Sequence, residues 1–503
     1  MQSRFFSAAI GDAVLLLLLS GLSAGGSLPE HPALGQLGIV AFSTSCEPAV
    51  QKEFERGIAL LHSFSYAEAR TSFMQVAARD PNCAMAHWGS AMTRFHQLWD
   101  PPFQADDAAK GRQEIQRAQQ VRAPSDRERR FIAALAHVYG QDAPYQIRVT
   151  NYASAMKEVA SVYRNDPEAQ VFYALALLAV ASPWDHTHSQ QKQAAKILEP
   201  LFRTYPQHPG IAHYLIHAYD SGELAGRGVV AARAYSRIAP SAPHALHMPS
   251  HIFTRLGMWD ESIVSNRAAR IAAHQHGDTG EELHAMDYLV YAYLQEDRAP
   301  EAKAVLEELA RMKNLDESDF KVAYAAVAMP VRYAVELRRW ADAASISPPP
   351  GAPPHVLAIA VWARALGLAR SGRPEQVHTE IGRLHQLETQ LRASGNLYWA
   401  KQVGIQALEA SAWLAQVEGK RREARTLLAQ AAGQEDTMEK LPVTPGPIIP
   451  AREQFGELLL AQNEPGLAVG EFQRALANAP RRRAGLLGLA RAAELAGARG
   501  SLP

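Results

Sequence analysis

The sequence predicts an all-α fold, a superhelix (α-solenoid) built from antiparallel helical hairpins. Hydrophobic residues make up 47% of the 503 residues and charged residues 20%, which is typical of a folded globular chain. Alanine and leucine are abundant and alternating runs of β-branched residues are absent, which favours helices over strands. A spacing of small and aromatic residues also recurs with a period of about 34 residues, as in arrays of helical repeats. The chain is therefore expected to be one array rather than three independent domains.

Residues 1–26 have the pattern of a signal peptide. Arg4 precedes the apolar run Ala13–Leu19, and the small-residue stretch Ser20–Gly26 follows it. The apolar run is too short to cross a bilayer stably, although an uncleaved N-terminal anchor is the alternative. We therefore expect an exported protein, periplasmic or secreted, with no stable membrane insertion after cleavage. Residues 27–45 lack a helical period and are expected to form a mobile leader.

Export would change the expected redox state of the only two cysteines. In an oxidising compartment Cys46 and Cys83 would pair by default, and they flank the first expected hairpin. A bridge that closes a loop of roughly 35–40 residues stabilises a protein by about 3.8 kcal/mol in the chain-entropy model. The alternative is two buried thiols. The disulfide is the preferred interpretation.

The repeat pattern is clearest at the two ends of the array. A small residue lets two helices approach, a second small residue and an aromatic one pack between them, and a proline closes the turn. The first copy has Gly57, Leu60, Tyr66, Ala69, Phe73 and Pro81, and the last has Gly456, Leu459, Ala468, Phe472, Ala475 and Pro480. Looser copies lie between them. The helix expected over 484–496 would cap the array.

This pattern resembles the tetratricopeptide-repeat (TPR) superfamily over most of residues 47–498. The chain also resembles an uncharacterised group of exported bacterial TPR proteins. The segments that carry this second likeness are Asp80–Met92, His208–Asp220, Ala242–Trp259 and Leu283–Gln295. The TPR resemblance implies binding of a protein or peptide in a concave groove, with no catalytic residues of its own.

Two proline-rich stretches divide the array. Residues 346–356 are expected to be an extended linker between an N-terminal TPR-like block (46–345) and a C-terminal TPR block (357–503). A second proline-rich loop, residues 441–450, interrupts the C-terminal block before its last repeat. A plain connection is the preferred interpretation of this loop, and an arm folded across the groove is the alternative.

The histidines form the only cluster in the sequence that is a candidate for a chemical site. Six of the 19 histidines fall between His208 and His251. His213 and His217 are four residues apart and share a helix face, as do His247 and His251. His284 begins the next similar helix. Since the first helices of repeats line the concave wall, we expect these five histidines to line the groove.

Three interpretations of these histidines stay open at this point. They are core residues that donate to backbone carbonyls, or polar groups of a peptide groove, or metal ligands. In the last case His213, His217, His247 and His251 would bind Zn²⁺ or Cu²⁺, with Asp220 or Asp287 as acceptors behind them.

Several classes of function are poorly supported. The chain has 51 basic and 51 acidic residues, so the electrostatic basis for nucleic-acid binding is missing. The sequence contains no H-E-x-x-H, G-x-S-x-G or G-x-x-x-x-G-K motif. We therefore expect an exported scaffold without catalysis or a required cofactor, which binds a protein or peptide of the cell envelope. The alternative is a metal-binding protein or metal-dependent enzyme that uses the histidines of residues 208–284.

Overall fold

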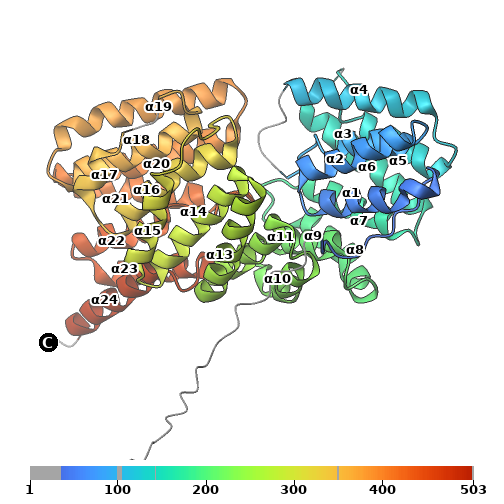
Figure 1. Cartoon of the computed structure of the whole chain (residues 1–503). Helices are drawn as coiled ribbons and strands as arrows, with labels where there is room; N and C mark the ends of the chain where they lie inside the picture. The colour runs from blue at the N-terminus through green and yellow to red at the C-terminus, as the bar shows by residue number, and fades with distance from the viewer. Residues whose placement is uncertain (1–34, 99–104, 142, 348–349, 501–503) are drawn as a thin grey trace, which may run out of the picture.

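The computed structural model describes residues 35–98, 105–141, 143–347 and 350–500 (Figure 1). Every regular element in these ranges is a helix, which confirms the all-α prediction. None of the helices described is long and apolar enough to cross a membrane. The predicted signal peptide, residues 1–26, lies outside these ranges.

The helices form two lobes joined by three short or medium helices (Figure 1). The N-terminal lobe contains η1 (Pro48–Val50), α1 (Gln51–His62), α2 (Tyr66–Arg79), α3 (Ala84–Met92), α4 (Ala105–Val121), α5 (Asp126–Ala136), α6 (Tyr145–Val162), α7 (Pro167–Ala179), α8 (Ser189–Thr204) and α9 (Pro209–Tyr219). Between the lobes lie α10 (Ala225–Ile238), α11 (Pro243–His247) and α12 (Pro249–Arg255). The C-terminal lobe contains α13 (Trp259–His276), α14 (Thr279–Gln295), α15 (Ala299–Leu309), α16 (Phe320–Glu336), α17 (Trp340–Ser345), α18 (Pro354–Arg370), η2 (Pro374–Gln376), α19 (Val377–Ala393), α20 (Leu397–Val417), α21 (Arg421–Glu435), α22 (Ala451–Ala461), α23 (Pro465–Asn478) and α24 (Arg483–Gly500).

Close helix approach occurs where the repeat pattern predicts it. A Cβ atom added to Gly57 of α1 would lie 2.7 Å from the ring of Phe73 in α2. In the last repeat, a Cβ added to Gly456 of α22 would lie 2.8 Å from the ring of Phe472 in α23. Each aromatic ring thus fills the space that its partner glycine leaves empty. The two ends of the array are therefore helical hairpins with the packing expected of TPR units.

The segment before the first helix is packed rather than mobile. In the described part of the expected leader, Phe42 is fully buried and its ring lies 5.4 Å from that of Phe54 and 5.6 Å from that of Trp88. The amide of Ile39 donates to the carbonyl of Gln207 at 2.9 Å. The expectation of mobility is corrected for residues 35–45. The lack of a helical period shows only that a segment is not a helix. A single aromatic residue in an extended segment can still fill a gap in the core.

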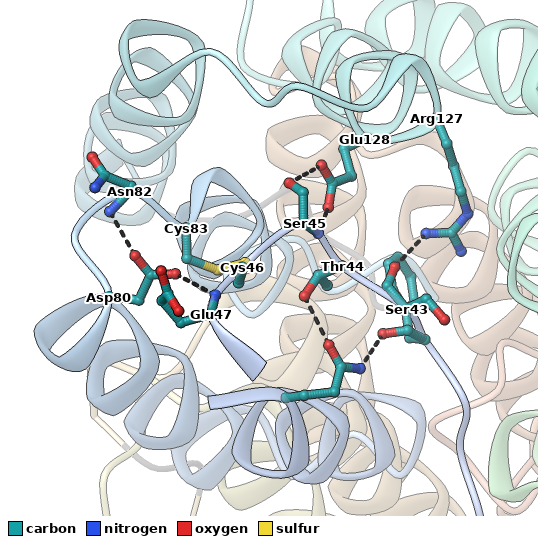
Figure 2. Close-up of a disulfide and its surroundings, with 12 residues drawn as sticks. Ser43, Thr44, Ser45, Cys46, Glu47, Asp80, Asn82, Cys83, Arg127 and Glu128 are labelled. Carbon is teal, nitrogen blue, oxygen red and sulfur yellow. Dashed lines mark hydrogen bonds between the residues drawn. A yellow bond between two sulfur atoms is a disulfide. The ribbon is translucent and has the colours of Figure 1, made fainter. Parts of the chain in front are cut away.

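Cys46 and Cys83 form the expected disulfide (Figure 2). Their Cα atoms are 4.7 Å apart and 37 residues separate them in the chain. Around the bridge, the amide of Glu47 donates to Asp80 Oδ2 at 2.8 Å, which holds the same two segments together. The bridge therefore joins the segment before α1 to the turn between α2 and α3.

The proline-rich stretch at 346–356 does not interrupt the core. Val331 and Ala343, before the stretch, belong to the same apolar cluster as Ile359 after it. Pro354 occupies the first turn of α18, where a missing N–H costs no hydrogen bond. Residues 354–356, expected to be extended, thus form the start of α18, and α17 packs directly against α18.

The segment between α21 and α22 makes hydrogen bonds to residues far away in the sequence. We call residues 439–450 the arm. The amide of Glu439 donates to the carbonyl of Pro183 at 2.9 Å, and Lys440 Nζ donates to Asp220 at 2.8 Å. Further along, the carbonyl of Thr444 accepts from Tyr288, and that of Pro447 accepts from Arg332. The arm is therefore packed against α14, α16 and the segments that flank α8 and α9, rather than being a connection without contacts to other helices.

Candidate functional site

The histidine site combines helices from the middle of the chain. The five histidines predicted to line the groove come together with a sixth, His244, which the prediction left out. The six are His213 and His217 of α9, His244 and His247 of α11, His251 of α12 and His284 of α14. All are buried except His217, which is partly buried. They form two groups of three, and in each group the candidate ligand atoms lie within 4.8 Å of one another.

The first trio is His213, His217 and His244. The Nε2 atoms of His213 and His217 are 3.1 Å apart. His213 Nδ1 lies 2.6 Å from the backbone carbonyl of His62, which can only accept, so this nitrogen carries the proton. His244 Nδ1 lies 3.1 Å from a carboxylate oxygen of Glu281. Nδ1 of His217 is buried and has no hydrogen-bond partner.

The second trio is His247, His251 and His284. The Nε2 atoms of His247 and His251 are 3.0 Å apart. His247 Nδ1 lies 2.7 Å from Asn266 Oδ1, and His251 Nδ1 lies 2.9 Å from a carboxylate oxygen of Asp220. The two trios adjoin, since the ring centroids of His217 and His251 are 6.0 Å apart.

Aromatic side chains fix the imidazole rings. Tyr235 stacks on His213 with 5.0 Å between ring centroids, and Tyr288 stacks on His251 at 5.3 Å. The ring of Phe64 meets His213 edge-on at 4.4 Å. Phe64 adopts a left-handed backbone conformation, with φ at 55°, which is unfavourable for a bulky residue. The fold thus maintains a locally strained turn that places this ring beside the first trio.

Burial lowers the pKa of His213, His217, His247, His251 and His284 and so favours their neutral form. It lowers the pKa of His251 to about 4, against the opposing effect of Asp220. Burial, together with neighbouring histidines, also holds the pKa of His213 and His247 well below the usual value. Neutral imidazoles carry one lone pair each, so the cluster offers several nitrogen ligands in a small volume.

Asp220 connects the second trio to the arm. Its Oδ2 accepts from His251 Nδ1 and from Lys440 Nζ, and its Oδ1 accepts from Arg255 Nε at 2.9 Å. Burial alone would raise the pKa of Asp220, but Lys440 and Arg255 hold it well below its usual range. Asp220 is therefore an ionised acceptor behind a histidine, as the sequence suggested. Asp287, the other acceptor considered, instead lies 3.6 Å from Arg332.

A third histidine group has a different character. Glu168 accepts from His62 at 2.9 Å and from His208 at 3.0 Å, and all three side chains are buried. His62 Nδ1 lies 2.9 Å from the hydroxyl of Tyr214, and His208 Nδ1 accepts from the amide of Ile211. Every ring nitrogen thus has a partner. These contacts join residues far apart in the sequence, so no local spacing could have revealed them.

Two cavities adjoin the arm. The side cavity, of about 350 Å³, is lined by His217, Asp220, His188, Glu439 and Lys440 among others. The inner cavity, of about 250 Å³, is lined by Tyr291, Tyr324, His355, Tyr398, Trp399 and Gln406, with arm residues 444–448, and shares Glu439 and Lys440 with the side cavity. The side cavity therefore reaches the first trio at His217, whereas the inner cavity lies among aromatic side chains of the C-terminal lobe.

Three of the residues that line the inner cavity each have a buried polar atom without a hydrogen-bond partner. The atoms are Trp399 Nε1, which can only donate, Gln406 Oε1, which can only accept, and His355 Nε2. Buried polar groups are normally paired, and an unmet one costs about 1–3 kcal/mol. A bound molecule with both donors and acceptors would satisfy them.

His355 makes the stability of the protein sensitive to mild acid. Its ring stacks on that of Trp399 with 5.1 Å between centroids, and burial lowers its pKa to about 4. The unfolded chain therefore binds this proton at a higher pH than the folded chain does, and stability falls as pH drops below 6.5. The expected loss between pH 7 and pH 5 is about 2 kcal/mol in urea unfolding. A His355→Phe variant should lack this share of the pH dependence, and His385→Phe, at an exposed histidine, should keep it.

Comparisons with known proteins return likenesses to solved structures only. No protein-family model matches the sequence, and no curated protein is significantly similar to it. A crystal structure of the P58(IPK) TPR domain is 13% identical, covers 90% of this chain and all of its own, and gives a TM-score of 0.23. Yeast Tom70 is 10% identical over 89% of this chain and 88% of its own, with a TM-score of 0.32. An IFIT1 mutant with Gppp-AAAA is 10% identical over 82% and 90%, with a TM-score of 0.37. The fold class therefore rests on the helix pairs themselves.

Proposed function

We propose that this chain is an exported helical-repeat scaffold that holds a segment of a partner protein of the cell envelope in the inner cavity. The observation that carries the proposal is the set of unpartnered polar atoms in an aromatic wall. Trp399 offers a donor and Gln406 an acceptor, which is what the alternating N–H and C=O groups of an extended peptide require. The volume of about 250 Å³ suits a short segment or a chain end rather than a folded domain.

The cavity wall also favours a peptide over a charged metabolite. Tyr324, Tyr398 and Trp399 supply large apolar surface with polar tips, as binding sites for proteins commonly do. Both signs of charge are present, since Arg452 and Lys440 line the cavity together with Glu435 and Glu439. Such a wall selects its ligand by shape and hydrogen bonding rather than by net charge.

The proposal of export is supported by the disulfide. Cys46 and Cys83 are the only cysteines in the chain, and they lie at bonding distance in the folded protein. A structural disulfide is typical of proteins that fold in an oxidising compartment. The periplasm is the simplest such place for a chain with an N-terminal segment of this composition.

Site-specific photo-crosslinking in intact cells tests the partner. A benzophenone amino acid at Gln402, which lines the inner cavity, should capture a protein in the periplasmic fraction. The control position is Leu397, on the same helix but 57% exposed and outside the cavity wall. Adding Trp399→Phe and Gln406→Ala should weaken capture from Gln402, because each change removes one of the unmet polar atoms. Equal capture from both positions, or none from Gln402, would exclude a partner in this cavity.

A further inference from the structure

The protonation of His247 and His251 can be worked out from their neighbours. Asn266 Nδ2 donates to the carbonyl of Ser262 at 2.8 Å, which fixes Asn266 Oδ1 as an acceptor. His247 Nδ1 faces that oxygen and so carries its proton. His251 Nδ1 faces the Asp220 carboxylate and also carries its proton. In each neutral ring the lone pair is therefore on Nε2.

These two lone pairs face one another at 3.0 Å. Two facing lone pairs repel, and neither ring has a proton left to form a hydrogen bond between them. A cation bound to both nitrogens removes the repulsion. Two nitrogens bound at about 2.05 Å to one tetrahedral ion lie roughly 3.3 Å apart, close to the separation observed. The third ring of the group, His284, offers its ligand atom within 4.8 Å of both.

The first trio brings two further Nε2 atoms together, although here Nε2 of His217 can donate to Nε2 of His213, because Nδ1 of His217 has no partner that fixes the proton there. An ion bound to both Nε2 atoms would place the His217 proton on Nδ1. Nδ1 of His213 donates to a backbone carbonyl, which leaves the lone pair of that ring on Nε2, and Nδ1 of His244 faces a carboxylate oxygen of Glu281. Nε2 of His213 and Nε2 of His217 are 3.1 Å apart. Protein ligands to transition metals commonly have this second contact, in which the nitrogen that does not bind the metal donates to a carboxylate or carbonyl.

The group of His62, Glu168 and His208 provides an internal comparison. Its donor atoms are also close enough together for a metal ion. Each of its ring nitrogens nevertheless has a partner of complementary type, so the group is complete without an ion. The second trio differs from it because the Nε2 atoms of His247 and His251 both carry lone pairs that face each other, and the first trio differs because Nδ1 of His217 has no partner.

A route to the site exists on one side. The side cavity, of about 350 Å³, is lined by His217 together with Asp220 and Lys440. His217 is also the least buried of the six histidines, and its Nδ1 has no partner. An ion can therefore reach the first trio through this cavity without opening the helix packing.

We propose that the two adjacent histidine trios, His213/His217/His244 and His247/His251/His284, bind a pair of divalent transition-metal ions. Three neutral imidazoles per ion form a donor set that suits Zn²⁺ and Cu²⁺ and leaves a coordination position open on each. Asp220, Asn266, Glu281 and the carbonyl of His62 orient the ligands from behind. This site is separate from the inner cavity and does not depend on the proposed partner.

Metal stoichiometry tests the proposal. The chain without a histidine tag, stripped by a chelator, is loaded with Zn²⁺ or Cu²⁺, desalted and analysed by elemental mass spectrometry. The wild-type protein should retain two equivalents. His213→Phe and His247→Phe should each retain one, and the double variant none. X-ray absorption of the zinc-loaded protein should show a nitrogen shell at about 2.0 Å and no sulfur.

A matched control separates the site from surface histidines. His378 is 68% exposed, and His378→Ala should still retain two equivalents. Circular dichroism before loading shows whether each variant is folded. Fewer than two equivalents in the wild-type protein would overturn the proposal. So would two equivalents that persist in the folded double variant, since the ions would then lie elsewhere.

Discussion

Replacing Arg482 with alanine should lower the free energy of unfolding of the C-terminal lobe by roughly 3–5 kcal/mol. Arg482 is 1% exposed and donates to Glu453 at 2.9 Å and to Tyr291 at 3.0 Å, and it lies 2.8 Å from Glu336. These partners belong to α22, α14 and α16, so one guanidinium joins three helices. Its removal leaves two buried carboxylates without a cation, and that uncompensated charge is the main cost.

The adjacent arginine is a suitable control. Arg483 is 41% exposed and pairs with Asp297, which is 69% exposed, so Arg483→Ala should cost at most about 1 kcal/mol. Hydrogen exchange of α22–α24 measures both variants, because hairpins in a repeat array depend mostly on their neighbours. The loss in free energy of unfolding caused by Arg482→Ala should also be smaller in mild acid, where the carboxylates of Glu336 and Glu453, left without their cation, can take up protons. Equal exchange in the two variants would contradict the role given to Arg482.

The sequence predicts the hairpins well because a hairpin is local. The contact between Gly57 and Phe73 follows from two consecutive helices, and its spacing can be read directly along the chain. The approach of His213 to His217 was predictable for the same reason, since both lie on one face of α9. His247 and His251 come together although α11 ends at His247 and α12 begins at Pro249. His244 could have been included, because it lies three residues before His247 on the same short helix.

Other features depend on contacts between distant residues. Lys440 reaches Asp220 across 220 residues, so no local pattern shows that the arm contacts the carboxylate that is paired with His251. Glu168 pairs with His62 across 106 residues, which places a buried carboxylate where the sequence suggests an ordinary helix. The sequence does not predict the packing of residues 35–45, because Phe42 is a single buried aromatic residue in a segment that is not helical. No periodic pattern of hydrophobic residues therefore marks it. All three features depend on contacts between residues that are distant in the sequence.

Reduction of the Cys46–Cys83 disulfide should destabilise the N-terminal hairpins by about 3.8 kcal/mol in the chain-entropy model. The two cysteines are 37 residues apart, and the loop between them contains α1 and α2. Without the bridge the unfolded segment gains the conformational freedom of that loop. Hydrogen exchange in α1–α3 should accelerate by up to roughly 500-fold on reduction, while α22–α24 serve as an unaffected internal reference.

The Cys46→Ala/Cys83→Ala variant should exchange at the reduced rate with or without reductant. An Asp80→Ala variant separates the bridge from the hydrogen bond beside it, since Asp80 accepts from the Glu47 amide across the same two segments (Figure 2). That bond acts only in the folded protein, whereas the disulfide also restricts the unfolded chain. The effect of reductant should therefore persist in Asp80→Ala at nearly its full size. If reduction leaves exchange in α1–α3 unchanged in both proteins, the hairpins are held by Phe42 and its aromatic neighbours instead, and the disulfide adds nothing to them.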